Sequence, residues 1–130
     1  MISIPRAVIA EDDDVSAAIR SALKLHGFEA WKTKSTEEFL TKVKEIEGRV
    51  DVVIINGAIA SDRNAMVIIK IKRINTAIKV LVVAERHEVE NKITAMDYGA
   101  DEFVLKPLTA DSIADKVTML LVETAGLARR

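Results

Sequence analysis

The chain has 130 residues, 49% of them hydrophobic and 30% charged, and its formal net charge is −1. This length and composition suit one globular domain and exclude a disordered chain, and the absence of cysteine excludes disulfides, thiolate metal sites and thiol catalysis. No apolar run is long enough to span a membrane and no signal-peptide pattern opens the chain, so we expect a cytoplasmic protein.

Five short apolar runs predict the strands of one sheet. The clearest runs are continuous and rich in β-branched residues, which is typical of strands that are buried on both faces of a parallel sheet. Two weaker runs fit strands nearer the edges of that sheet. In chain order the predicted strands are residues 7–10, 28–33, 52–55, 80–83 and 102–105.

Five segments with helical periodicity lie between and after these runs. Their apolar residues follow the i, i+3, i+4 spacing of a helix with one buried face. The predicted helices begin after Asp14 and near Ser35, and then span about residues 65–75, 88–98 and 111–124. Glycines predict where four of them end: Gly27, Gly48, Gly99 and Gly126.

Strand and helix therefore alternate along the whole chain. Such alternation implies right-handed crossovers and a parallel sheet with helices on both faces. The predicted fold class is α/β, with one domain over residues 1–125 and a short carboxyl-terminal tail over residues 126–130.

Four acids follow the first predicted strand, at the edge where open parallel sheets bind their ligands. Carboxylates of a loop, such as those of Glu11 and Asp12, suit a hard cation such as Mg²⁺. The alternative is that the acids, above all Asp14, cap the first helix and favour its positive end. For Glu11 and Asp12 both interpretations stay open.

Lys106 and Pro107 follow the fifth predicted strand. A residue before proline is held out of helical geometry, and proline makes a cis peptide bond affordable. This arrangement would point the Lys106 ammonium across the strand ends toward the acids.

Taken together, these residues resemble the receiver domain of two-component response regulators, over nearly the whole chain. The best segments are residues 8–13, 51–56 and 97–107, and the last is the most specific because Gly-Ala-Asp, an aromatic position and Lys-Pro fall at the family's spacing. The resemblance implies a doubly wound, flavodoxin-like sheet in the order 2-1-3-4-5. It also implies a signalling protein or a histidine kinase as partner.

In that family, two acids after the first strand and an aspartate after the third bind Mg²⁺, and the aspartate accepts a phosphoryl group from a histidine kinase. A threonine or serine after the fourth strand and a lysine after the fifth contact the phosphoryl oxygens. By this resemblance Glu11 and Asp12 match the acidic pair, and Lys106 matches the lysine. Phe103 occupies the position where an aromatic side chain turns inward on activation.

Two positions differ from the family's pattern. Asn56 stands at the phosphoacceptor position, where its amide is too poor a nucleophile to form an acyl phosphate. Ala84 stands at the hydroxyl position and cannot contact a phosphoryl oxygen. With one carboxylate fewer, Glu11 and Asp12 are expected to bind Mg²⁺ weakly or not at all, and no other cofactor is expected.

We therefore expect a receiver that acts without phosphorylation, as a signalling interaction module and not an enzyme. By the resemblance, the surface of the fourth helix, fifth strand and fifth helix is its interaction face, and reciprocal charge pairs there could support a homodimer. The residues expected on that face are Glu88, Glu90, Lys92, Ile93, Asp97, Tyr98, Asp101, Glu102, Asp115, Lys116 and Val117.

Two other functions stay open. A substitute acid, Asp62 or Asp13, could accept the phosphoryl group, although in-line transfer depends on positions that neither acid shares with the family's aspartate. The same architecture can also bind a nucleotide or a flavin, but the sequence contains neither G-x-G-x-x-G nor G-x-x-x-x-G-K-[ST].

Basic residues gather at Lys70, Lys72, Arg73 and Lys79. Their spacing scatters the charges around the predicted third helix, and a solvated helix face explains them. The near-zero net charge adds no attraction for a phosphate backbone. We therefore expect no direct nucleic-acid binding and no membrane contact by this domain.

Overall fold

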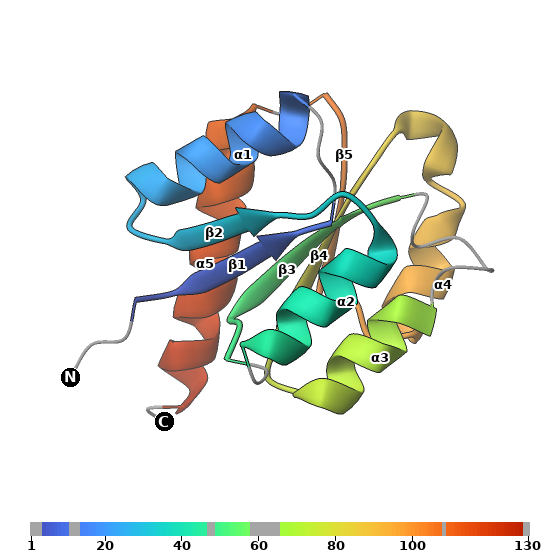
Figure 1. Cartoon of the computed structure of the whole chain (residues 1–130). Helices are drawn as coiled ribbons and strands as arrows, with labels where there is room; N and C mark the ends of the chain where they lie inside the picture. Colours follow the sequence, from blue (N-terminus) through green and yellow to red (C-terminus); the bar gives the residue numbers. More distant parts are fainter. Residues whose placement is uncertain (1–3, 11–13, 47–48, 58–65, 108, 129–130) are drawn as a thin grey trace.

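A computed structural model describes residues 4–10, 14–46, 49–57, 66–107 and 109–128 of the chain. Five parallel strands form one sheet in the order β2-β1-β3-β4-β5, as predicted (Figure 1). The strands are β1 (Arg6–Ile9), β2 (Glu29–Lys32), β3 (Val52–Asn56), β4 (Lys79–Ala84) and β5 (Glu102–Leu105). The predicted α/β fold class is therefore confirmed.

Helices cover both faces of the sheet (Figure 1). They are α1 (Asp14–Leu25), α2 (Thr36–Glu45), α3 (Met66–Ile74), α4 (Asn91–Asp97) and α5 (Ala110–Ala128), with a short 3₁₀ helix, η1 (Arg86–Glu88), before α4. The helices α1 and α5 pack on one face, and α2, α3 and α4 pack on the other. None of the helices in the described ranges is long and apolar enough to cross a membrane.

The core has two halves, one on each face of the sheet. Along β3, Val53 and Ile55 face α2 and α3, whereas Val52 and Ile54 face α1 and α5, because side chains alternate along a strand. All four of these side chains are buried. Burial on both faces explains why the central strands are continuous apolar runs and do not alternate with polar residues.

The fourth helix differs from its prediction. A single helix over residues 88–98 was expected, but the structure has η1 followed by α4, which begins at Asn91. The Glu88 carboxylate accepts a hydrogen bond from the Glu85 backbone N–H at 2.8 Å, and the Asn91 side-chain amide donates to the Gly57 carbonyl at 2.9 Å. These side chains bind loop backbone, which competes with one continuous helix.

Two helix ends also differ from the prediction. The helix α5 continues through Ala128, so residues 126–128, expected in the tail, are helical and the predicted stop at Gly126 is wrong. A glycine inside a helix costs only about 1 kcal/mol, which a long helix tolerates. Asp14, expected to precede α1, is its first residue. The predicted Ser35 cap is confirmed, because its Oγ accepts the Glu38 N–H at 3.1 Å, whereas Gly48 lies outside the described residues.

Candidate functional site

The carboxyl ends of β3, β4 and β5 bring three of the predicted site residues to one edge of the sheet. Asn56 ends β3 and Ala84 ends β4, and Lys106 directly follows β5. The Lys106 backbone N–H donates to the Ala84 carbonyl at 2.8 Å, so the ends of β4 and β5 are held side by side. Glu11 and Asp12, predicted to complete this edge, lie outside the described residues, as do the alternative acceptors Asp13 and Asp62.

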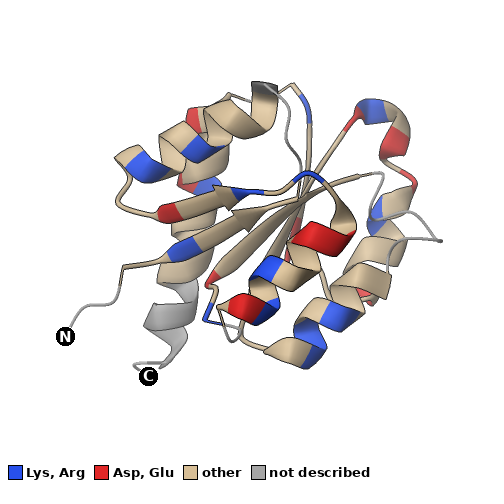
Figure 2. Cartoon of the chain, viewed as in Figure 1, with Lys and Arg blue, Asp and Glu red and all other residues tan. Residues whose placement is uncertain are grey.

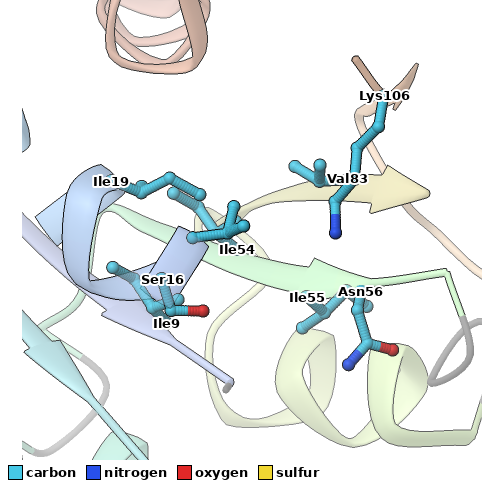
Figure 3. Close-up of a pocket in the computed structure, with 9 residues that line it drawn as sticks. Ile9, Ser16, Ile19, Ile54, Ile55, Asn56, Val83 and Lys106 are labelled. Atoms are coloured by element: carbon cyan, nitrogen blue, oxygen red, sulfur yellow. The ribbon is translucent and has the colours of Figure 1, made fainter. Parts of the chain in front are cut away.

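A small cavity of about 20 Å³ lies at this edge, and Figure 3 shows the residues around it. Its lining residues come from β1, β3, β4 and α1, with Lys106 after β5, and the polar residues among them are Ser16, Asn56 and Lys106. This volume holds about one water molecule. A nucleotide or flavin needs a pocket of several hundred Å³, so this cavity does not fit the alternative of a nucleotide or flavin site.

Lys106 forms an ion pair with Glu85. The Lys106 Nζ lies 3.2 Å from Glu85 Oε1, and the two side chains are 26% and 51% exposed. In Figure 3 the Lys106 side chain extends past Val83 and directs its ammonium toward β3. The peptide bond between Lys106 and Pro107 is cis. Sequence reasoning pointed this ammonium at Glu11 and Asp12 and missed Glu85, whose only signal was its position directly after Ala84.

The side chain of Asn56 is half-buried, and its carboxamide points away from the Lys106 ammonium (Figure 3). An amide offers one carbonyl oxygen and one NH₂ group, both neutral. Among the described side chains at the cavity, the oxygen atoms that a Mg²⁺ ion could use are the neutral Asn56 carbonyl and Ser16 hydroxyl, and the described ranges contain no group of three or more acidic, cysteine or histidine side chains that could hold a metal ion. These residues alone are a poor fit for a divalent cation.

The loop after β3 is packed closely against the loop after β4. A Cβ atom on Gly57 would lie 2.6 Å from Ala84 Cβ and 2.8 Å from Glu88 Oε1, both far too close. The Gly57 N–H donates to the Val83 carbonyl at 3.1 Å, and Asn91 holds the Gly57 carbonyl. Glycine is therefore required at position 57 for this approach, a role that sequence reasoning missed.

Phe103 lies on the α2–α3–α4 face of the sheet and is only 7% exposed. It pairs in register with Val82, two residues before Ala84, and the three side chains belong to the same half of the core. The Ala84 side chain is a single methyl group and is fully buried. The ring of Phe103 is therefore turned inward, in the half of the core that also contains Ala84.

The surface of α4, β5 and α5 is partly as predicted. Ile93 is 75% exposed and Met96, three residues later on α4, is also exposed, as is Val89 just before the helix. Val117 was assigned to this surface wrongly, because it is fully buried against α1 and the β-strands. Asp101 is partly exposed, but its carboxylate is paired with Lys72 and Lys79. Val117 therefore cannot face a partner, and the lysine contacts hold the Asp101 carboxylate within the fold.

Comparisons with a family model and with individual proteins identify the same family. Residues 7–118 match the response regulator receiver domain. The transcriptional regulatory protein PrrA of Mycobacterium leprae is 26% identical over 121 residues, which cover 92% of this chain and 51% of PrrA. The chain thus spans about half the length of this relative.

Solved structures show the same fold. The CheY-like receiver domain protein of Methanospirillum hungatei JF-1 has a TM-score of 0.81 at 21% identity, covering 95% of this chain and 98% of its own. An atypical orphan response regulator, described as having a phosphorylation-independent regulatory mechanism, has a TM-score of 0.74 at 25% identity, covering 89% of this chain and 94% of its own. With the family match extending from β1 into α5, the chain belongs to the response regulator receiver domains of two-component signalling.

Proposed function

We propose that this receiver domain signals without phosphorylation, as a protein-interaction module that holds one conformation. The observation that carries the proposal is Asn56 at the end of β3, at the edge where the resemblance places the phosphoacceptor aspartate. An amide oxygen is too weakly nucleophilic to attack a phosphoryl donor, so the acyl phosphate does not form. The atypical orphan response regulator of similar fold is a precedent for such a mechanism.

The ion pair between Lys106 and Glu85 supports the same proposal. In the family, the corresponding lysine contacts the phosphoryl group. Here its ammonium has a carboxylate partner within the chain, 3.2 Å away, before any phosphate arrives. An internal partner of this kind stands in for the charge that phosphorylation would add.

The buried ring of Phe103 supports a fixed conformation. By the resemblance, an aromatic side chain at this position turns inward on activation, when a hydroxyl residue after the fourth strand moves toward the phosphoryl group. Ala84 has no hydroxyl to move and fills little space, and Phe103 is inward without any modification. The chain therefore occupies constitutively the arrangement that phosphorylation would otherwise select.

We place the output surface on α4, β5 and α5. Ile93 and Met96, three residues apart on α4, form an exposed apolar patch there, and Val89 just before α4 is also exposed. The same surface carries charged groups, including an ion pair between Lys116 of α5 and Glu102 of β5 at 3.9 Å. A patch of this kind suits a signalling protein, a histidine kinase or a second copy of the chain, and a two-fold interface would pair its charges reciprocally.

Weak binding of Mg²⁺ is part of the proposal. Glu11 and Asp12 would have to hold the ion with the neutral Asn56 carbonyl, and one negative charge fewer lowers the attraction for a divalent cation.

Intact mass spectrometry tests the proposal. The full chain is incubated with acetyl phosphate and Mg²⁺, and Asn56→Asp serves as the matched control that regains a nucleophile. We expect the wild type to keep its mass and the variant to gain one phosphoryl group. A phosphoryl group on the wild type, located by peptide mapping to Asp62 or Asp13, would contradict the proposal and support the substitute-acid alternative.

A further inference from the structure

A groove between α2 and α3 lies on the face of the sheet that faces away from α1 and α5. It encloses about 250 Å³ and is lined by Leu40, Lys44, Lys70, Arg73 and Ile74. Leu40 and Ile74 are partly buried and pack against the core, so they form an apolar floor. The three basic side chains are exposed and form the rim. Figure 2 shows basic residues on both of these neighbouring helices.

The positive charge of this rim is not neutralised. The helix α3 has three basic residues and no acidic one. Lys72 is used within the fold, because its Nζ binds Asp101 at 2.9 Å and the Ile78 carbonyl. Within the described part of the chain, Lys44, Lys70 and Arg73 make no ion pair.

The geometry concentrates this charge around the floor. Lys70 and Arg73 are three residues apart, so they lie on one side of α3, and Lys44 approaches the groove from α2. Glu37 shares the helical stripe of Lys44 but lies two turns earlier and does not line the groove. The sequence alone scattered the basic cluster around one helix, and only the pairing of α2 with α3 adds Lys44 to it.

We propose that this α2–α3 groove binds an acidic segment of a partner protein. An apolar side chain of that segment would rest on the floor of the groove, and the carboxylates on either side of it would pair with the basic rim. The apolar floor and the cationic rim together match an amphipathic acidic helix, which is a common way for a peptide to occupy a groove. A nucleic acid would use the rim alone, and three cations on a chain of net charge −1 give little counterion release. The groove lies apart from the strand-end site, so this inference stands independently of the phosphorylation chemistry proposed there.

Fluorescence anisotropy with designed peptides tests the complementarity. The probe is a labelled helical peptide with leucines along one face and glutamates beside them. One matched peptide replaces the glutamates by glutamine, and another replaces the leucines by serine. We expect the full chain to bind the probe and to bind each matched peptide at least about ten-fold more weakly. Absence of binding to the probe, or equal binding of either matched peptide, would overturn the proposal.

Charge-reversal variants locate the site. Lys70→Glu with Arg73→Glu is expected to weaken binding of the probe by about ten-fold or more. Lys24→Glu on α1, compared with Lys70→Glu alone, is the matched control, because Lys24 is also exposed and lies on the other face of the sheet, and it should change the affinity by less than about two-fold. Equal losses in both variants would show non-specific attraction and overturn the proposal. Unchanged thermal unfolding midpoints would confirm that the variants fold.

Amide chemical shifts provide a second readout that does not depend on any variant. On titration of the probe, we expect the largest shifts at Leu40, Lys44, Lys70, Arg73 and Ile74. Shifts confined to α4, β5 and α5 would move the site to the output surface and overturn the proposal. A single-stranded oligonucleotide that competes as strongly as the acidic peptide would overturn it in favour of nucleic acid, and sedimentation showing a groove-dependent dimer would overturn it in favour of a second copy.

Discussion

The two ends of the sheet both contain a carboxylate that meets lysine, but they are built differently. At the amino end, Asp101 is 24% exposed and its Oδ2 accepts the Val80 N–H at 2.8 Å and the Lys72 ammonium at 2.9 Å. At the carboxyl end, Glu85 is 51% exposed; its carboxylate pairs with Lys106 at 3.2 Å and takes part in a capping box with Glu88 at the start of η1. Several partners fix Asp101, whereas Glu85 remains open to water.

The amino end of the sheet therefore contributes to stability, whereas the carboxyl end contains the candidate functional site. At the amino end, carboxylates bind the backbone of strands as they begin: Asp101 binds the Val80 N–H, and Asp51 binds the Arg6 N–H at 2.8 Å. Such contacts join the strands, and losing them leaves backbone donors unsatisfied. The exposed pair at the carboxyl end contributes little to stability, so evolution can exchange it without unfolding the domain.

Removing the amino-end carboxylate should give the largest effect. We expect Asp101→Ala to lower the free energy of unfolding by about 2–3 kcal/mol, because it leaves the Val80 N–H and the Lys72 ammonium without their acceptor. Urea unfolding followed by circular dichroism measures the loss. Asp97→Ala, at an exposed position on α4, is the control and should change stability by less than about 0.5 kcal/mol. Equal effects of the two changes would refute the structural role of Asp101.

At the carboxyl end, the close packing at Gly57 should matter more than the ion pair. We expect Gly57→Ala to destabilise the domain by about 1–3 kcal/mol, because the added methyl group meets Ala84 and Glu88. Urea unfolding gives the change in the free energy of unfolding, and amide chemical shifts at Ala84, Glu88 and Asn91 show which of the neighbouring residues move. A variant as stable as the wild type would mean that the two loops are not held together as described.

Restoring a carboxylate at the carboxyl end should change its ion binding. We expect Asn56→Asp to raise the affinity for Mg²⁺ by about ten-fold, because it would add a third carboxylate to Glu11 and Asp12, the pair that the resemblance assigns to the metal. Isothermal calorimetry or a titration of amide shifts measures the change. Asn75→Asp, which adds the same charge after α3, is the control. If the wild type already saturates well below millimolar Mg²⁺, the expectation of weak binding is wrong.

The exposed ion pair should give the smallest effect. We expect Glu85→Gln to change the free energy of unfolding by less than about 0.5 kcal/mol. A double-mutant cycle with Lys106→Met should give a coupling energy that is equally small, whereas a cycle between Asp101 and Lys72 should exceed about 1 kcal/mol. Comparable coupling energies at the two ends would remove the distinction drawn between them.

The fold could be predicted from the sequence because its signals are local. The continuous apolar runs of β3 and β4 identify buried parallel strands, and parallel strands necessarily bring Asn56, Ala84 and Lys106 to one edge. The partners of these residues could not be predicted in the same way. The pairing of Lys106 with Glu85 depends on the register between β4 and β5, and the start of α4 depends on a contact from Asn91 to Gly57, 34 residues away.

The surroundings of Asp101 and Val117 could not be predicted for the same reason. Asp101 looks like a solvated acid until the packing of α3 brings Lys72 beside it. Val117 was placed on a surface, but the face of α5 that carries it is the one that packs on α1 and the sheet. Contacts between elements that are distant in sequence decide both positions, and a pattern within one element does not contain them.

The most direct test of the central claim observes Phe103 in the unmodified protein. The aromatic NMR signals of this ring are recorded before and after addition of acetyl phosphate in the presence of Mg²⁺, with the Asn56→Asp, Ala84→Ser variant as a control that regains both missing groups. We predict that the wild-type ring gives one set of signals, typical of a buried ring, and that the phosphodonor leaves them unchanged. A second set of Phe103 signals that appears in the wild type only with acetyl phosphate would contradict a receiver that works without phosphorylation.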